Sequence, residues 1–153
     1  LVPCWDWAKE ENLYSGKHHT TGLNLQVAAT LCGTLAWVSD PMPGCTHDSK
    51  AIDTTGILDH FPAHTLVGDK GYIGKNMITP HRKPAGGQLT ENQKEFNKAV
   101  NSIRAAVERA IAHLKTWRIL HTAYRRPLHT FHETISAVIA LEFFRKKDPV
   151  DAT

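Results

Sequence analysis

A long helical segment, predicted from Glu91 to about Leu120 with room for a break inside, constrains the fold of this chain more than any other feature. Thr90 and Gln93 match the capping-box pattern that begins a helix. An apolar stripe then recurs at helical spacing, and it consists of Val100, Ile103, Val107, Ala110, Leu114 and Trp117. Because a helix of this length must bury such a face against another element, we expect the chain to fold in layers.

A second stripe on the same segment is mostly polar, and it consists of Asn101, Arg104, Glu108, Ile111 and Lys115. Glu108 therefore lies beside the buried face rather than opposite it. With Arg104 one turn earlier and Arg109 next in sequence, Glu108 is either ion-paired on a solvated face or a functional carboxylate. Helix spacing alone leaves both interpretations open.

The stretch GDKGY, residues 68–72, places Asp69 between two glycines directly after an apolar pair. An apolar run followed by glycine predicts a strand, here at residues 65–67, that ends abruptly. Asp-x-Gly is also ordinary β-turn chemistry, so the motif alone leaves two interpretations. If Asp69 lies at the end of a strand, this aspartate and a helix glutamate that faces it would offer the oxygen ligands that divalent cations prefer.

The remaining pattern predicts an α/β protein with a mixed sheet. Alternating apolar residues predict a strand over residues 23–29 and a second around 35–38, joined by a hairpin turn at 32–34. The prolines and glycine of residues 41–44 are expected to interrupt the sheet. Residues 77–79 are a short strand candidate, and residues 1–3 resemble the tail of a strand.

Two further helices are predicted. One runs from Asp48 to about Phe61, with Asp48 and Ser49 able to cap its start. The other runs from about His129 to Lys147.

The sequence gives no sign of a secreted or membrane-embedded protein. No apolar run approaches the length of a membrane span, and the first residues lack the pattern of a signal peptide. The three cysteines show no C-x-x-C spacing, which favours reduced thiols in the cytoplasm.

Charge is divided unevenly along the chain. Residues 1–76 hold five Lys/Arg against eight Asp/Glu, whereas residues 77–153 hold thirteen against seven. An acidic half joined to a basic half is typical of a carboxylate site beside a surface that binds a polyanion. Random drift in surface charge is the alternative.

Four motifs then occur in one order, and together they resemble the catalytic domain of DDE insertion-sequence transposases, in the bacterial group related to Harbinger-type nucleases. They are Tyr14-Ser15-Gly16-Lys17-His18-His19, Pro43-Gly44-Cys45-Thr46-His47-Asp48, Gly68-Asp69-Lys70-Gly71-Tyr72 and Arg104-x3-Glu108-x6-Lys115. The resemblance implies a ribonuclease H-like mixed sheet flanked by helices, with an incomplete first strand. It implies one catalytic domain at residues 1–147, followed by a tail at 148–153.

The resemblance also implies a site in which three acidic residues bind two Mg²⁺ or Mn²⁺ ions. Asp69 matches the second acidic position and Glu108 the third, with Arg104 and Lys115 as the signature basic residues around the glutamate. Asn101 stands where many relatives carry tyrosine, so a role that needs a phenol there is not carried over.

Two acidic positions stay open in that comparison. Asp48 matches a further acidic position of the family, and its rival role is the cap of the helix that begins there. The family's first acidic residue lies in an Asp-Gly-Thr-like stretch, and Leu1-Val2-Pro3 resembles the residues directly after that stretch. We therefore expect the first aspartate to lie upstream of this sequence, and the chain as written not to be a competent enzyme. Asp6 falls past the strand and is a poor substitute.

The implied partner is DNA, both transposon ends and target. Lys70, Arg104, Lys115 and Arg118 are the predicted DNA-binding residues, and Arg125 and Arg126 are either further backbone contacts or solvated surface. Paired DNA ends imply a homodimer or larger assembly on DNA. The expected location is the bacterial cytoplasm, at the nucleoid when bound to DNA, with no membrane partner.

Two other functions are weighed against this one. A noncatalytic DNA-binding remnant or domesticated module would share the basic half without an intact metal cluster. A zinc hydrolase is suggested by the ten histidines, but the spacings of His18-His19, Cys45-x-His47 and His129-x2-His132 do not match recognised zinc sites.

Overall fold

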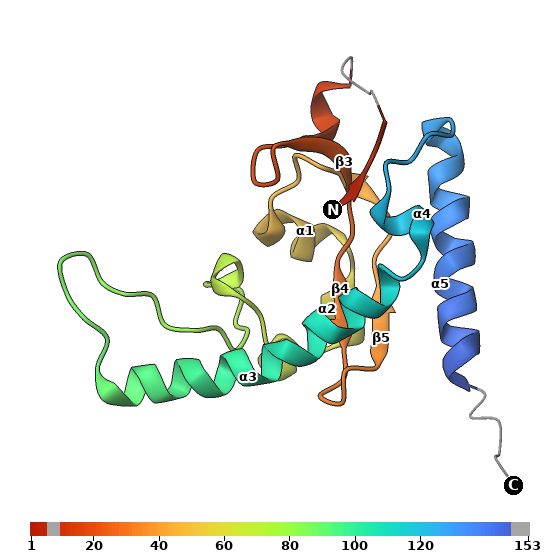
Figure 1. Cartoon of the computed structure of the whole chain (residues 1–153). Helices are drawn as coiled ribbons and strands as arrows, with labels where there is room; N and C mark the ends of the chain where they lie inside the picture. Colours follow the sequence, from red (N-terminus) through yellow and green to blue (C-terminus); the bar gives the residue numbers. More distant parts are fainter. Residues whose placement is uncertain (6–9, 148–153) are drawn as a thin grey trace, which may run out of the picture.

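The structure, a computed structural model, describes residues 1–5 and 10–147 as a mixture of small sheets and helices (Figure 1). The strands are β1 (Val2–Pro3), β2 (Tyr14–Ser15), β3 (Thr20–Asn24), β4 (Val27–Ala29), β5 (Leu35–Val38) and β6 (Met42–Pro43). The helices are α1 (Asp48–Thr54), α2 (Ile57–His60), α3 (Glu91–Leu114), α4 (Arg118–His121) and α5 (Phe131–Lys147). Short 3₁₀ turns span Glu11–Leu13, Ala63–Thr65, Lys70–Tyr72 and Leu128–Thr130. Asp6 and the predicted tail at 148–153 lie outside the described residues.

The strands form two small antiparallel groups. In the first, β3 pairs with β1, β2 and β6, and in the second, β4 and β5 form the predicted hairpin. Parallel pairing occurs at two isolated bridges, Cys4 with Tyr124 and Val67 with Ile78. The predicted α/β class is confirmed, but the strands of both sheets pair antiparallel instead of forming the predicted mixed sheet. The ribonuclease H-like arrangement stays a prediction. Within the described residues, no helix combines the length and apolar character needed to cross a bilayer.

Two strand predictions are wrong in detail. The strand expected over residues 23–29 is divided: β3 ends at Asn24 in the first sheet and β4 begins at Val27 in the second. Between them the Gln26 N–H donates to Ser39 Oγ at 2.9 Å. Residues 41–44 do not simply interrupt the sheet, since Met42–Pro43 forms β6 at the side of β3. A proline is tolerated there because a sheet edge leaves one backbone face unpaired.

Two further elements are shorter than predicted. The helix expected from Asp48 to Phe61 stops at Thr54, because Gly56 takes a left-handed conformation with φ of 69° before α2 begins. The strand expected at residues 65–67 is reduced to the bridge between Val67 and Ile78, preceded by a 3₁₀ turn.

The long helix α3 begins as predicted. Thr90 Oγ1 accepts from the Gln93 N–H at 3.3 Å, and the Gln93 side chain accepts from the Thr90 N–H at 3.0 Å, which completes the capping box. The helix ends at Leu114, and α4 begins after a short turn, so the expected break is confirmed. In Figure 1, α3 runs past β4 and its first half extends away from the rest of the chain, beside the loop at 79–90.

The apolar stripe of α3 is only partly buried. Val100, Ala110 and Leu114 are buried as predicted, and so is Ala106, whereas the Ile103 side chain is 40% exposed. Ile103 lies instead at the rim of a cleft described below.

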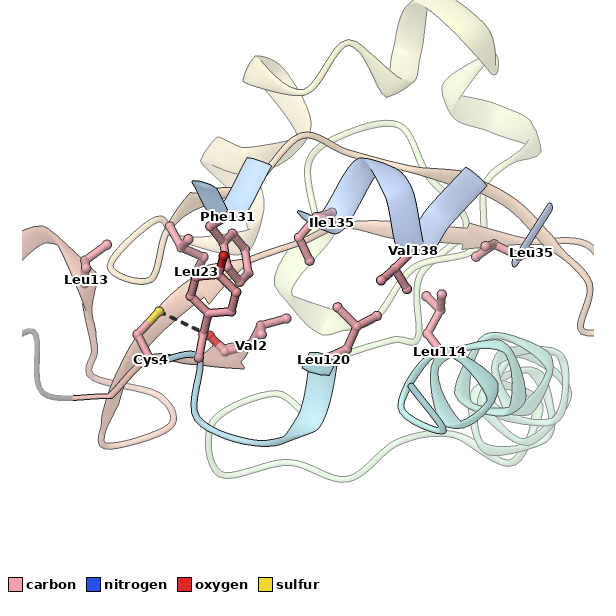
Figure 2. Close-up of a cluster of buried hydrophobic side chains, with 11 residues drawn as sticks. Val2, Cys4, Leu13, Leu23, Leu35, Leu114, Leu120, Phe131, Ile135 and Val138 are labelled. Atoms are coloured by element: carbon pink, nitrogen blue, oxygen red, sulfur yellow. Dashed lines mark hydrogen bonds between the residues drawn. The ribbon is translucent and has the colours of Figure 1, made fainter. Parts of the chain in front are cut away.

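The main core joins α5 to β1, β3 and the end of α3 (Figure 2). It consists of Val2, Cys4, Leu13, Leu23, Leu35, Leu114, Leu120, Tyr124, Phe131, Ile135 and Val138. Ile135 and Val138 point from α5 toward Leu114 and Leu120. The α5 helix therefore fixes where α3 ends.

One buried charge lies in this region. Glu142 on α5 is fully buried, accepts a hydrogen bond from Trp117 Nε1 at 3.0 Å and forms an ion pair with Arg145 at 2.8 Å. A buried carboxylate needs such partners because desolvation penalises the charge. The contact ties α5 to the turn between α3 and α4.

A candidate active-site cleft

A cleft of about 350 Å³ lies between β4, α1, the GDKGY stretch and α3. Its floor is apolar, with Val27, Ile52 and Val67 among its residues. Its polar lining consists of Lys17, His18, Asn24, Gln26, Thr30, Asp48, Thr65, Asp69, Tyr72, Arg104 and Glu108. Residues from all four motifs that carry the resemblance thus meet at one place.

Asp69 forms the turn that its motif predicts, and its role as a metal ligand stays a prediction. Its Oδ1 accepts from the Gly71 N–H at 2.7 Å and begins the 3₁₀ turn, which is the turn chemistry expected of Asp-x-Gly. The same carboxylate lines the cleft. A Cβ on Gly71 would lie 2.9 Å from Asp69 Oδ1 and 3.7 Å from Asp48 Oδ2, so the bare glycine lets the two carboxylates converge.

Asp48 is the first residue of α1 rather than its cap. His47 holds the cap position and makes no capping hydrogen bond with its side chain, so the predicted capping role of Asp48 is wrong. Asp48 Oδ2 instead accepts from Lys17 Nζ at 2.7 Å. That hydrogen bond is the main reason that the pKa of Lys17 is raised, and the charge of Asp69 acts in the same direction.

Glu108 reaches the cleft from α3. Among the described residues it has no ion-pair partner, and Arg104 donates instead to Asn101 Oδ1 at 3.4 Å. The surface ion pair considered for Glu108 therefore does not form in this part of the chain. Glu108 is exposed, whereas Arg104 is half-buried.

The acidic side chains share the cleft without forming a closed cluster. Within residues 1–5 and 10–147, no three His, Cys, Asp or Glu side chains gather closely enough to hold a metal ion. Within these residues the histidines and cysteines considered for a zinc hydrolase likewise do not gather into a group that could hold a metal ion. The donor types nevertheless suit a hard cation, and the Lys17 ammonium shows that Asp48 accepts a positive charge at this point.

The other predicted DNA-binding residues lie outside the cleft lining. Lys70 is exposed in the 3₁₀ turn and Lys115 comes directly after α3, and neither lines the cleft. Arg118 lines a separate hollow. The amino group of Leu1 lies within the electrostatic reach of Lys115, Asp48 and Lys17, and its pKa is lowered chiefly by burial.

A buried hydrogen-bond network lies under the carboxylates, and sequence reasoning missed it. Gln26 Nε2 donates to the Asp48 carbonyl and to the Tyr72 hydroxyl, both at 3.3 Å, and Gln26 Oε1 accepts from Thr55 at 3.0 Å. Gln26 is buried, which makes each of these bonds costly to lose. The only signal in the sequence is a glutamine within an alternating apolar pattern.

Tyr72 reports on this network through its ionisation. Burial, with the nearby charges of Asp48 and Asp69, raises its pKa from 10.0 to about 12. As the pH rises, the unfolded state therefore loses the phenol proton first. The free energy of unfolding should fall by about 1.4 kcal/mol per pH unit between the two pKa values, and this group should have no effect on it below them.

The effect is measured by urea unfolding of the wild type and of Tyr72→Phe. Each protein is unfolded at a pH below the two pKa values and at a pH in the window between them. The wild type is expected to lose more stability than Tyr72→Phe on entering the window. Equal losses would mean that the phenol is not held protonated.

Residues 3–142 match the sequence profile of a family described as DDE superfamily endonuclease. The chain belongs to this family. The chain is 34% identical over 122 residues to a protein of Streptomyces albus G described as a transposase for insertion sequence element IS112. It is 36% identical over 87 residues to a protein of Microchaete diplosiphon described as a transposase for insertion sequence element IS702.

The chain matches only part of these longer relatives. The first alignment covers 78% of this chain and 46% of the relative, and the second covers 54% and 31%. The chain thus spans less than half the length of either. No solved structure matches it. The predicted family is confirmed, whereas the roles of individual site residues stay predictions.

Proposed function

We propose that this chain is the catalytic part of a DNA transposase, which cleaves phosphodiester bonds and transfers strands at transposon ends. The observation that carries the proposal is that Asp48, Asp69 and Glu108, from three separate segments, line one cleft together with Lys17 and Arg104. Carboxylates beside cationic groups suit a phosphodiester, because the former bind divalent ions and the latter bind phosphate.

In this proposal Asp69 and Glu108 hold Mg²⁺ or Mn²⁺, with Asp48 as a further ligand, and the complete site takes two ions. When bound, the ions supply Lewis-acid stabilisation of the attacking and leaving oxygens. In the complete site of the family a further acidic residue would complete the set of ligands. A chain without that residue is expected to bind DNA without cutting it.

The other residues of the cleft position the substrate and the carboxylates. Lys17 and Arg104 would neutralise phosphate oxygens, and Lys17 would exchange its contact with Asp48 for one with the substrate. Gln26 holds the start of α1 and the Tyr72 hydroxyl in place through its hydrogen bonds. The Tyr72 hydroxyl is protonated near neutral pH, as a phenol ordinarily is, so it can donate a hydrogen bond while it accepts one from Gln26.

DNA beyond the cleft would contact Lys70, Lys115 and Arg118. Such contacts to the backbone read no sequence and weaken as salt rises. Strand transfer between paired ends would require at least a homodimer.

A noncatalytic DNA-binding remnant remains the second candidate, and one observation favours it. The Lys17 ammonium already pairs with Asp48, and no three metal-binding side chains gather within the described part of the chain. A remnant would keep DNA binding while losing divalent-metal binding.

Calorimetric titration with Mg²⁺ and Mn²⁺ distinguishes the two candidates. We expect Mn²⁺ to bind this chain with measurable heat and Asp69→Asn to weaken that binding by at least about tenfold, because a lost carboxylate removes both a ligand and a charge. Glu95→Gln, on the exposed surface of α3, is the matched control and should bind Mn²⁺ like the wild type. DNA binding without any metal binding would instead identify a remnant.

A further inference from the structure

A second hollow, of about 360 Å³, lies on α4 and the segment directly after it. Three arginines line it, Arg118, Arg125 and Arg126, and its other lining residues include no acidic side chain. Among the described residues none of the three guanidinium groups has an ion-pair partner. The hollow therefore concentrates positive charge that this part of the protein does not compensate.

The backbone of the hollow is firmly held. Tyr124 is buried, its N–H donates to the Pro3 carbonyl at 2.8 Å, and its carbonyl accepts from the Trp5 N–H at 2.8 Å. The Tyr124 ring packs edge-on against Phe131 at 4.7 Å. Arg125 and Arg126, the next two residues, are thus attached to a rigid point of the core.

One of the arginines is also oriented by an aromatic ring. The Arg125 guanidinium lies 4.6 Å from the centre of the Trp5 ring, and Trp5 is 58% exposed. A cation–π contact of this kind limits the rotamers of the arginine without neutralising its charge. An exposed tryptophan that supports an unpaired arginine suits ligand binding better than it suits stability.

The chemistry of the hollow selects a ligand with several negative charges. Three cations held close together repel one another, and a polyanion relieves that repulsion. The planar fork of arginine binds phosphate oxygens in pairs, and it does so better than lysine. The hollow lies beyond Lys115, at the end of α3 whose earlier turns line the cleft.

We propose that the hollow formed by Arg118, Arg125 and Arg126 binds backbone phosphates of DNA, with Trp5 positioning Arg125, as a contact site separate from the cleft. The identity of the polyanion as DNA rests on the proposed function. The charge and shape of the hollow do not depend on metal binding.

The test measures DNA binding by this chain in the presence of EDTA, so that metal binding plays no part. The probe is a short fluorescein-labelled duplex of arbitrary sequence, monitored by fluorescence anisotropy at several salt concentrations. Arg125→Gln and Arg126→Gln should each weaken DNA binding about fivefold. Each should also make the decrease of log K, the logarithm of the DNA association constant, with log salt less steep by about 1. Arg82→Gln, an exposed arginine in the loop at 79–90, is the matched control and should stay within about twofold of the wild type.

Variants of Trp5 test the positioning role. Trp5→Leu removes the ring and should weaken DNA binding about threefold, whereas Trp5→Phe keeps an aromatic face and should restore most of the affinity. Circular dichroism of each variant checks that the fold is kept. If Trp5→Leu and Trp5→Phe bind DNA equally, the positioning role is wrong.

Binding of inorganic phosphate tests whether the ligand of the hollow is DNA or a free anion. If phosphate at low concentration binds the wild type but not Arg125→Gln, while duplex binding is the same for both proteins, the hollow serves a free anion and the proposal is overturned. Unchanged duplex affinity and salt slope in both arginine variants would also overturn it. Duplex binding in EDTA involves no metal, so a failure of the metal proposal would not be mistaken for a failure of this one.

Discussion

In a longer form of this protein that nicks DNA, Asp69→Asn and Glu108→Gln are each expected to lower divalent-metal-dependent DNA nicking about a thousandfold. The expected size is set by the several kcal/mol that metal ions contribute to stabilising the transition-state charge. Both substitutions keep the size of the side chain and remove one negative charge. The two carboxylates line one cleft from different walls, so neither can replace the other.

The measurement is conversion of supercoiled plasmid carrying terminal-repeat DNA to nicked circles, with Mg²⁺ or Mn²⁺. Glu95→Gln supplies the control, because it removes the same charge from an exposed position on the same helix. It should nick at the wild-type rate. DNA affinity should stay within about twofold in all three variants, which separates loss of chemistry from loss of binding.

Nicking that survives in Asp69→Asn or Glu108→Gln would remove the metal site proposed for the cleft. Loss of nicking together with DNA binding would point to a folding defect or to a role in binding. Only loss of nicking with binding retained supports the catalytic assignment.

Local signals in the sequence were enough to predict the elements they control. The capping box at Thr90 and Gln93 and the hairpin between β4 and β5 depend on neighbouring residues, and both form as expected. The helix expected from Asp48 failed for a local reason that could have been weighed: Gly56 takes a left-handed conformation and ends α1. Glycine within a helical pattern was the available signal.

The convergence of Asp69 and Glu108 on one cleft could be anticipated from a strand end and a helix stripe. The details of the cleft could not, because they depend on contacts between distant residues. Lys17 and Asp48, which form an ion pair, are 31 positions apart in the sequence, and Gln26 and Tyr72, which share a hydrogen bond, are 46 positions apart. Helical periodicity likewise cannot show that Ile103 lies at a cleft instead of in the core.

Glu142 shows the same limit for the core. Its position on α5 fits either a solvated face or a buried one, and only the Trp117 indole and Arg145 show why the carboxylate is tolerated inside. The partners come from the turn between α3 and α4 and from α5 itself, so the packing of α5 against that turn had to be known first.

Phe131→Ala is expected to lower the free energy of unfolding by about 3–5 kcal/mol, the cost of leaving a large cavity in a packed core. The Phe131 side chain is 1% exposed, and its ring packs edge-on against Tyr124 at 4.7 Å. That contact is worth a further fraction of a kcal/mol beyond the buried area. Because Tyr124 bonds to Pro3 and Trp5, the loss should also loosen β1 and the segment that carries Arg125 and Arg126.

Urea denaturation monitored by circular dichroism measures the change, and Phe144→Ala on the same helix is the matched control. Phe144 is 68% exposed, so its truncation should alter stability by no more than about 0.5 kcal/mol. Equal losses from the two substitutions would show that α5 does not pack through the Phe131 face. A large loss for Phe131→Ala alone supports the packing in which α5 holds the end of α3, and through Tyr124 the arginine hollow, in place.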